Sequence, residues 1–401
     1  MKFSRREFIE TAAVTSAAMA ATPGALAQTN KSANTAANGK TMVVCKYTGI
    51  QSIDGAYELM RRGGDTLDAA IFVLRAQEDD PRDDSVGFGG LPNEDGEVEL
   101  DCSMMHGPTG RAGAVGAVRR IKNVSLLAKT VMEHTGHVLI VGEGASRVAK
   151  LHGFQEENLL TERSRKIWQL WKESMSDQDW WGPSLSDPNW KPPTNLTGVP
   201  VAEDRKKRLQ EVAADLGIEP EWRDYAVEKV MSPPTGTIPC ITLNEKGEMS
   251  AAVSTSGLAW KIPGRLGDSP IVGAGIYLDR DIGGAGVTGN GEENIKIAGS
   301  HTVVEAMRRG MEPKEAAMEA LKRLVALYKN DMTRLRYINL VFHVLRRDGA
   351  YAGVALWGQS SSGKQLQIAV HDGTKRLENV SAMFEGKGLS WPPVPMLPGA
   401  K

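Results

Sequence analysis

The residues best placed to do chemistry are Gly236 and Thr237, which lie where a proline-rich segment meets an apolar run. A threonine hydroxyl is a weak nucleophile, so it needs a base close by. If the bond between Gly236 and Thr237 were cut, the new α-amine, with a pKa of about 8, would supply that base from the same residue. The same hydroxyl could make the cut by attacking the Gly236 carbonyl, and glycine enters the strained backbone that this attack requires at low cost. An ordinary start of a strand is the alternative that this spacing leaves open.

Arg265 and Asp268 form the second group of interest, in a loop rich in glycine. The planar guanidinium of arginine matches a carboxylate, and an aspartate three residues later can receive an ammonium group. The pair therefore suits the two charged groups of a free amino acid. A solvent-exposed ion pair is the alternative when the two residues are taken alone.

Residues 284–289 read Gly-Ala-Gly-Val-Thr-Gly, which matches the spacing of a dinucleotide-binding loop. The βαβ repeat that such a loop needs is missing, and Glu292 and Glu293 follow where a pyrophosphate would sit. A tight turn is therefore the simpler interpretation. Such a turn could direct the Thr288 hydroxyl and the Gly289 N–H at an anion, and two donors of this kind stabilise a developing oxyanion.

Two other sites are weaker candidates. His134 and His137 have the H-x-x-H spacing of a metal site but lack a set of carboxylates nearby. Cys240 lies three residues after Thr237, so in a strand its side chain faces the opposite side, and we expect it in the core.

The periods of the apolar residues predict the elements that must position these groups. Helices are expected at 52–63, 65–77, 123–134, 161–175, 203–215, 291–309 and 313–329. Strands are expected at 42–44, 97–105, 111–118, 138–141, 238–243, 249–254, 271–278, 336–345 and 350–357. The strand at 138–141 should be buried, and the strand at 350–357 should close the chain. Two mixed halves, joined by a proline-rich linker at 174–234, indicate a layered α/β or α+β protein.

Longer motifs resemble the glycosylasparaginase/asparaginase family of N-terminal-nucleophile hydrolases. The most specific of them is G-R-x-G-D-S-P-x-x-G-A-G at 264–275. In the N-terminal half the resemblance lies at 78–81, 85–90, 95–96, 121–123 and 131–135. It covers the chain from roughly 41 to 170 and from 236 to roughly 360, and it leaves out the linker.

This resemblance implies an α+β fold, a four-layer αββα sandwich, made as one chain and cut into two that stay associated. The expected pieces are an α-chain, 28–236, which includes the linker, and a β-chain, 237–401, which carries the nucleophile. The implied reaction is hydrolysis of the side-chain amide of an asparagine derivative through a threonyl ester, with release of aspartate. In the glycosylasparaginase branch the substrate is N4-(β-N-acetylglucosaminyl)-L-asparagine. No cofactor or metal is implied, and the family suggests a homodimer of cut protomers.

The resemblance also implies the roles of single residues. It implies that Thr237 is the nucleophile and that Thr255 orients it. Arg265 would bind the α-carboxylate of the substrate, and Asp268 its α-ammonium group. Thr288 and Gly289 would form the oxyanion hole. The site of self-cleavage is the bond between Gly236 and Thr237.

Three positions depart from the glycosylasparaginase branch. The residues before the nucleophile, 235–236, are Thr-Gly instead of His-Asp, and glycine there is typical of the plant-type asparaginase and isoaspartyl peptidase branch. Lys46, followed by Tyr47, stands where a tryptophan lines the substrate pocket, and Met-His at 105–106 replaces Met-Asp. These changes concern the leaving group more than the asparagine end. An L-asparaginase or isoaspartyl peptidase, and an uncleaved binding protein that keeps the aspartate pocket, therefore remain the alternatives.

The first 27 residues have the pattern of an export signal. A charged start with arginines at 5–6 is followed by small, weakly apolar residues at 11–21 and by Ala-Leu-Ala at 25–27, an A-x-A cleavage site. The paired arginines resemble the bacterial twin-arginine signal. We therefore expect a protein that is exported after folding and works in the periplasm or outside the cell, with a disordered basic N-terminus as the alternative.

The composition excludes several classes of protein. The 401 residues carry 48 Lys+Arg against 49 Asp+Glu, so a nucleic-acid binder that works through a bulk basic field is excluded. Three cysteines exclude a disulfide framework. Apolar runs are shorter than the roughly 20 residues of a membrane span, so no membrane partner is expected.

Overall fold

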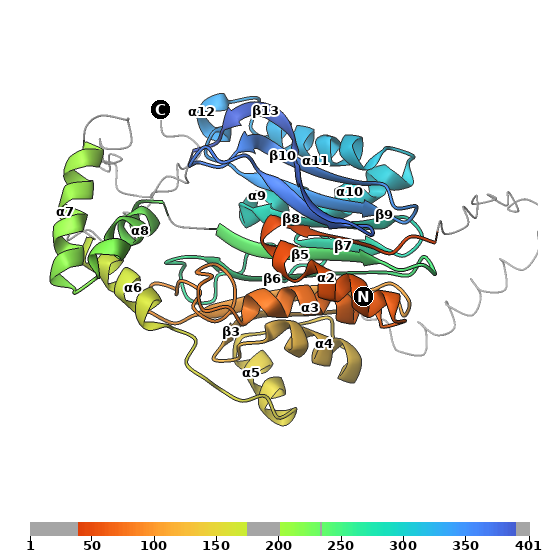
Figure 1. Ribbon diagram of the computed structural model, residues 1–401, viewed down its shortest axis with the longest axis horizontal. Coiled ribbons are helices and arrows are strands. Elements are labelled where there is room, and N and C mark those ends of the chain that lie inside the picture. Colours follow the sequence, from red (N-terminus) through yellow and green to blue (C-terminus); the bar gives the residue numbers. More distant parts are fainter. Residues whose placement is uncertain (1–38, 175–200, 233–234, 390–401) are drawn as a thin grey trace, which may run out of the picture. The chain divides into compact units, whose positions relative to one another are not determined.

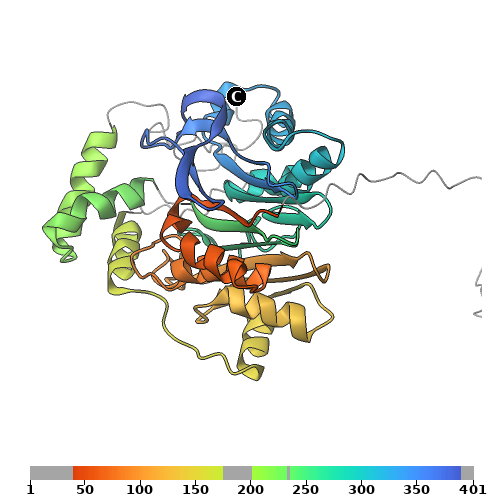
Figure 2. The same ribbon diagram turned by 45° about the vertical axis from the view of Figure 1, so that its right-hand side comes forward.

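The computed structural model describes residues 39–174, 201–232 and 235–389. The expected signal segment, 1–27, and the central part of the proline-rich linker lie outside these residues. Within them, two stacked β-sheets are covered on their outer faces by helices (Figure 1). A view turned by 45° shows the same order of layers (Figure 2).

The larger sheet contains Thr237 near its centre, in the strand order β12-β11-β1-β5-β6-β2-β3-β4. Its strands are β1 (Met42–Lys46), β2 (Glu99–His106), β3 (Arg111–Arg119), β4 (Leu139–Val141), β5 (Thr235–Leu243), β6 (Met249–Leu258), β11 (Gln367–His371) and β12 (Lys375–Asn379). Strand β5 pairs antiparallel with β1 on one side and with β6 on the other. Both neighbours of β5 can therefore place side chains around Thr237.

The smaller sheet has the strand order β13-β10-β9-β8-β7. Its strands are β7 (Ile276–Asp279), β8 (Gly283–Gly289), β9 (Leu340–Arg346), β10 (Tyr351–Gln359) and β13 (Ser381–Lys387). Across the sandwich, β8 contacts β5 and β9 contacts β1. The two sheets thus meet over the strands that flank Thr237.

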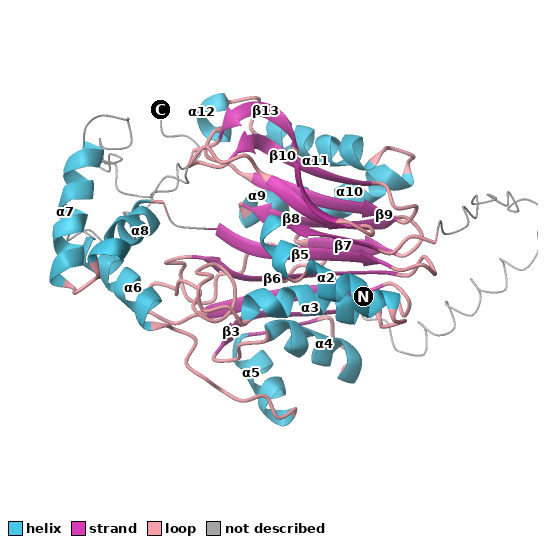
Figure 3. Cartoon of the chain, in the orientation of Figure 1, coloured by secondary structure: helices cyan, strands magenta, loops and turns pink. Residues whose placement is uncertain are grey.

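Helices cover both outer faces (Figure 3). The larger sheet is covered by α2 (Ile53–Arg61), α3 (Thr66–Glu78) and α4 (Val124–His134), and the smaller sheet by α10 (Gly299–Arg308) and α11 (Pro313–Leu327). The short helix α9 (Gly291–Ile297) packs against α10 and α11. Further elements are the 3-10 helix η1 (Tyr47–Gln51), α5 (Gly142–Leu151), which contacts β3, and α12 (Met332–Leu335). This arrangement confirms the predicted α+β, four-layer αββα sandwich. Among the described helices, none is long and apolar enough to cross a membrane.

Alternation along the strands divides the core into three layers. In β1, Val43 packs toward the helices of the larger sheet, whereas Val44 packs between the two sheets. In β5, Cys240 belongs to the first of these clusters and Ile241 to the second, so Cys240 is a core residue as predicted. A third cluster, which includes Phe342, fills the space between the smaller sheet and its helices.

Three helices between the two halves pack as a unit. They are α6 (Glu162–Ser174), α7 (Val201–Asp215) and α8 (Pro220–Met231). The sequence predicts α6 and α7 but misses α8, although Pro220 in its first turn is typical of a helix start. Leu209 and Val227 are buried in the apolar cluster of this unit, and the Trp171 ring stacks on Trp260 with 5.0 Å between centroids. The described part of the linker is therefore a packed helical unit that ends just before β5.

Several predictions about single elements are wrong. Strand β4 is not buried, since Leu139 and Val141 are 42% and 43% exposed at the edge of the sheet. The helix predicted at 291–309 is interrupted at Ala298, whose left-handed φ of 45° separates α9 from α10. The last predicted strand does not close the chain, because β11 returns to pair with β1, and β12 and β13 follow.

The glycine-rich segment is a strand, β8, and not the predicted tight turn. A Cβ at Gly286 would lie only 2.6 Å from the Cβ of Pro239 on β5. Glycine in a strand often marks a place where another backbone approaches closely. The glycines of β8 therefore let the two sheets meet at short distance.

Candidate active site

The Thr237 hydroxyl lies at an irregularity of the central sheet. The pairing of β5 with β6 shifts between Gly236 and Ile238, and such bulges redirect the side chain at the irregular position. Thr237 is buried, and its hydroxyl donates a hydrogen bond to Thr255 Oγ1 at 3.2 Å. The Thr255 hydroxyl in turn donates to the carbonyl oxygen of Gly236, and it accepts from the Gly257 N–H at 2.8 Å. The Thr255 hydroxyl therefore contacts both the Thr237 hydroxyl, which is the expected nucleophile, and the Gly236 carbonyl, which this nucleophile would attack.

Gly236 is required for a reason that differs from the sequence argument. Its φ is not in the left-handed region, so backbone strain does not select glycine here. A Cβ at this position would overlap the Ser85 side chain. Ser85 is fixed because its N–H and hydroxyl both donate to Asp83 Oδ1, at 2.8 and 2.6 Å. The glycine thus lets the scissile peptide pack directly on Ser85, a contact that the sequence did not predict.

The Arg265 guanidinium lies beside the end of β6. A Cβ at Gly257 or at Gly267 would come within 3.1 or 3.0 Å of Arg265 Nη1. The Nε and Nη2 groups of Arg265 both donate to Oε1 of Glu292, at 2.8 and 2.6 Å. Arg265 is therefore paired with a carboxylate of the protein itself, and its role in binding the α-carboxylate of a substrate stays a prediction.

Asp268 is a buried carboxylate with a polar neighbour. Asn294 Nδ2 donates to Asp268 Oδ2 at 2.7 Å. Burial raises the pKa of Asp268 to about 6, although the Asn294 hydrogen bond and the charge of Arg265 oppose this shift. A Cβ at Gly291 would lie 2.9 Å from Asp268 Oδ1, so the start of α9 also approaches this carboxylate. A buried carboxylate of this kind gains much from a cation, which suits the predicted role in binding an ammonium group.

Thr288 lies across the sandwich from Thr237. Gly286 on β8 packs against Pro239 on β5. Because side chains on one face of a strand recur every two residues, Thr288 faces the same side of β8 as Gly286, toward β5. The structure thereby places a hydroxyl donor on the sheet opposite the expected nucleophile.

Gly289 can only be glycine. Its φ is 119°, and a Cβ would overlap the carbonyl oxygen of Asn339. The Asn290 N–H donates to that carbonyl at 2.8 Å, and the Asn339 N–H donates to Asn290 Oδ1 at 2.6 Å. These two bonds fix the end of β8, which carries the predicted oxyanion-hole pair.

A second buried polar cluster lies beside Arg265, and the sequence did not predict it. Lys261 Nζ donates to the Glu99 carbonyl oxygen at 3.0 Å, and Asp101 Oδ1 accepts from the Ala117 N–H at 2.8 Å. Burial lowers the pKa of Lys261, whereas the charges of Asp101 and Glu99 oppose that shift. The sequence signal that could have revealed this cluster is the pair of acids Glu99 and Asp101, at alternate positions of the otherwise mainly apolar strand β2.

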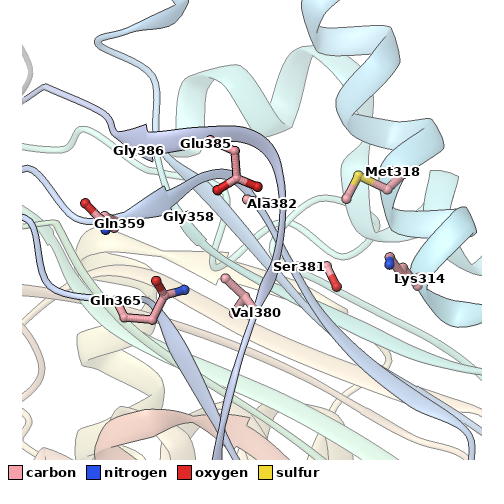
Figure 4. Close-up of a pocket in the computed structure, with 10 residues that line it drawn as sticks. All are labelled: Lys314, Met318, Gly358, Gln359, Gln365, Val380, Ser381, Ala382, Glu385 and Gly386. Carbon is pink, nitrogen blue, oxygen red and sulfur yellow. The ribbon is translucent and has the colours of Figure 1, made fainter.

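A cavity of about 330 Å³ lies away from these residues (Figure 4). It is bounded by β10, β13 and α11, and its polar lining includes Lys314, Gln359 and Glu385. None of the predicted site residues lines it. The expected catalytic residues therefore lie outside this cavity, and Thr237 itself is buried.

The weak metal candidate gains no support. The His134 ring lies 5.1 Å from the His152 ring, centroid to centroid. In the part of the chain that the structure describes, no group of three His, Cys, Asp or Glu side chains is placed to hold a metal ion. His134 and His137 are both exposed, at and just beyond the end of α4.

Comparison with known proteins identifies the family. The sequence profile of the family described as Asparaginase matches residues 24–333. The chain belongs to this family. A protein named N(4)-(beta-N-acetylglucosaminyl)-L-asparaginase from Elizabethkingia miricola is 34% identical over 373 residues, which cover 93% of each chain.

Two more distant members of the asparaginase family carry related names. The Mus musculus N(4)-(beta-N-acetylglucosaminyl)-L-asparaginase is 33% identical over 72% of this chain and 78% of its own. A probable isoaspartyl peptidase/L-asparaginase from Arabidopsis thaliana is 31% identical over 78% of this chain and 83% of its own. This asparaginase-family chain is therefore a hydrolase of linear amide C–N bonds, which confirms the class predicted from the sequence. The roles of its individual site residues stay predictions.

Proposed function

We propose that this chain cuts itself between Gly236 and Thr237 and then hydrolyses the side-chain amide of N4-(β-N-acetylglucosaminyl)-L-asparagine. The observation that carries the proposal is the hydrogen-bonded array of Thr237, Thr255 and the Gly236 carbonyl. The names of the Elizabethkingia miricola and Mus musculus relatives support this substrate.

Self-cleavage starts with attack of the Thr237 hydroxyl on the Gly236 carbonyl carbon. The hydrogen bond from the Thr255 hydroxyl to that carbonyl oxygen stabilises the negative charge that develops there. The acyl group moves from the Thr237 nitrogen to its oxygen, and water hydrolyses the resulting ester. The products are a carboxylate at Gly236 and a free α-amine at Thr237.

Turnover of the substrate uses the same hydroxyl with its new base. The α-carboxylate of the substrate binds Arg265, and its α-ammonium binds Asp268. The Thr237 α-amine takes the proton of the hydroxyl, which attacks the β-carbonyl, while Thr288 and Gly289 donate to the oxyanion. The amine leaves with a proton, and water then hydrolyses the aspartyl ester and releases aspartate.

Two measurements test the proposal together. On a denaturing gel the mature protein should give two pieces, and sequencing of the one that spans 237–401 should begin with Thr-Ile-Pro. The same preparation should release aspartate from N4-(β-N-acetylglucosaminyl)-L-asparagine. A single intact band with no release would refute the proposal and favour an uncleaved binding protein.

A second candidate is an L-asparaginase or isoaspartyl peptidase. The glycine before Thr237 and the name of the Arabidopsis thaliana relative favour it. Rates on the glycosylated asparagine, on L-asparagine and on a β-aspartyl peptide distinguish the candidates, because they differ only in the amine that leaves.

We also propose that the chain is exported by the twin-arginine route and works as a homodimer of cut protomers. Replacing arginines 5–6 by lysine should retain the protein in the cytoplasm, which cell fractionation would show. Sedimentation of the purified protein tests the dimer, and a particle of one protomer would refute it.

A further inference from the structure

The two neighbours of β5 serve different ends of the proposed substrate site. Thr255 lies on β6, and Arg265 and Asp268 follow β6 in the chain. Strand β1 lies on the opposite side of β5. A substrate that runs from Arg265 and Asp268 to Thr237 therefore directs the group beyond its scissile amide toward β1.

Lys46 is the last residue of β1, close to Thr237 in the sheet. Cys45 pairs with Cys240 of β5, so the next position along β1 lies beside Pro239. Pro239 is two residues from Thr237 along the same strand. Lys46 and Thr237 are therefore near neighbours on adjacent strands.

The Lys46 side chain faces the space between the sheets. It lies two residues after Val44, which belongs to the cluster between the sheets, and alternate residues share a face. The side chain is partly buried, and its ammonium lies 5.8 Å from the ring centroid of Tyr47. Among the described residues, the Lys46 ammonium has no hydrogen-bond or ion-pair partner. It therefore has hydrogen-bonding capacity to offer a ligand.

The acids closest to Lys46 are held by other partners. Asp84 accepts from Lys229 Nζ at 2.8 Å and from the Tyr225 hydroxyl, both on α8. Asp83 accepts the two hydrogen bonds from Ser85 described above. Burial lowers the pKa of Lys46, and the charges of Asp83 and Asp84 only partly oppose the shift. The ammonium thus lacks a carboxylate in direct contact.

His343 on β9 supplies an independent observation of the region between the sheets next to Lys46. Its side chain is buried, and neither ring nitrogen has a hydrogen-bond partner among the described residues. Burial, and then the charge of Lys46, lower the pKa of His343 to about 3, so the ring is neutral. A neutral imidazole offers one donor and one acceptor. The region between the sheets next to Lys46 therefore contains the Lys46 ammonium and the unpaired imidazole of His343.

We propose that Lys46 selects the leaving group: its ammonium binds an anionic group on the departing amine, so that the enzyme cleaves β-aspartyl amides of carboxylate-bearing amines faster than their neutral counterparts. The inference rests on the proposed function, because Thr237 must accept the aspartyl group. In that step the bond between the β-carbonyl carbon and the amide nitrogen breaks, and a bond to Thr237 Oγ1 forms. The hydroxyl proton leaves with the amine. Lys46 contacts only the part that departs.

Two peptides that differ in one charge test this inference, namely β-aspartyl-L-alanine and β-aspartyl-L-alaninamide. The ratio of their kcat/KM values is measured for the cut wild-type enzyme and for Lys46→Met, Lys46→Arg and Lys364→Met. The last variant is a control that removes an exposed lysine elsewhere. We expect a ratio of about 10 or more, equivalent to about 1.4 kcal/mol, for all except Lys46→Met, whose ratio should be about 1.

A wild-type ratio of one or less, or an unchanged ratio in Lys46→Met, would overturn the role of Lys46. An enzyme that hydrolyses glycosylated asparagine but neither peptide would overturn it as well. Failure of the proposed function looks different, because then none of these substrates is hydrolysed. If Lys46→Met does not cut itself, the ratios of the wild type and Lys46→Arg still decide, together with the fall in the wild-type ratio expected on adding salt.

Discussion

The two ends of the proposed substrate site are built in different ways. The amino-acid end comes from one stretch of chain, in which Thr255, Arg265, Asp268 and Asn294 lie on β6, the loop after it and α9. The leaving-group end is assembled from β1, the loop with the two aspartates, α8 and β9. The first end is therefore defined by local spacing, whereas the second depends on how distant segments pack.

This difference matches the chemistry that each end must recognise. The proposed substrates share an α-carboxylate and an α-ammonium, so any change at Arg265 or Asp268 should affect all of them alike. They differ in the amine, so a change at Lys46 should alter the order of preference among them. Variants of the two ends are thus expected to separate total activity from selectivity.

The largest effect is expected from Thr237→Ala, which removes the nucleophile common to every substrate. The variant should stay full length and release no aspartate, because the hydroxyl serves both the cut and the turnover. A denaturing gel and an aspartate assay check this. Thr235→Ala is the matched control, since it removes the hydroxyl of the threonine two positions earlier in the sequence and should still be cut. Cleavage of Thr237→Ala would remove Thr237 from its proposed role at both ends.

Arg265→Gln should have the next largest effect. Loss of one partner of a hydrogen-bonded, largely desolvated charge pair costs about 2–5 kcal/mol, so kcat/KM should fall by about 30-fold or more. The fall should be equal for β-aspartyl-L-alanine and β-aspartyl-L-alaninamide, in contrast to Lys46→Met. Steady-state kinetics on both peptides provide the measurement. A change in their ratio would show that the two ends are not independent.

The fold was predictable where the pattern is local. Helices α2 and α3 and the hairpin of β5 and β6 follow from apolar periods and turn residues in short windows. Strand β11 was missed because its place beside β1 depends on pairing with residues about 300 positions earlier. Strand β8 was mistaken for a turn because its glycines reflect the approach of a second sheet, which no local pattern contains.

The candidate site, like the fold, was predictable where its residues lie in a local motif and not where it depends on distant segments. Motif resemblance identifies Thr237, Arg265 and Asp268, and in the structure they contact Thr255, Glu292 and Asn294, respectively. The sequence argument gave the wrong reason for glycine at 236. The actual reason is the close contact with Ser85, which could not be predicted because Ser85 lies more than 100 positions earlier in the chain. The surroundings of Lys46 could not be predicted either, since they depend on a helix, α8, that the sequence analysis missed.

The pH dependence should reveal Asp268, and it should be the same for both peptides because they share the amino-acid end. The pKa of Asp268, raised by burial to about 6, means that the carboxylate becomes protonated and loses its affinity for an ammonium as the pH falls through this value. The Thr237 α-amine, with an ordinary pKa of about 8, must also be neutral. A plot of log kcat/KM against pH should therefore rise with a slope of about two below pH 6 and about one between pH 6 and 8. A slope of one down to pH 5 would contradict an essential ionised Asp268.

The smallest effect is expected from Glu292→Gln. Glu292 occupies the Arg265 fork, but its side chain is 47% exposed, so solvent screening limits the pair to about 1 kcal/mol or less. A substrate carboxylate must compete with it, and the variant should lower KM by up to about fivefold for every substrate. Glu312→Gln, which removes an exposed carboxylate from Arg346, is the control and should leave KM unchanged. A rise in KM in Glu292→Gln would mean that Glu292 orients Arg265 for binding, and the amino-acid end would then depend on α9 as closely as the leaving-group end depends on α8.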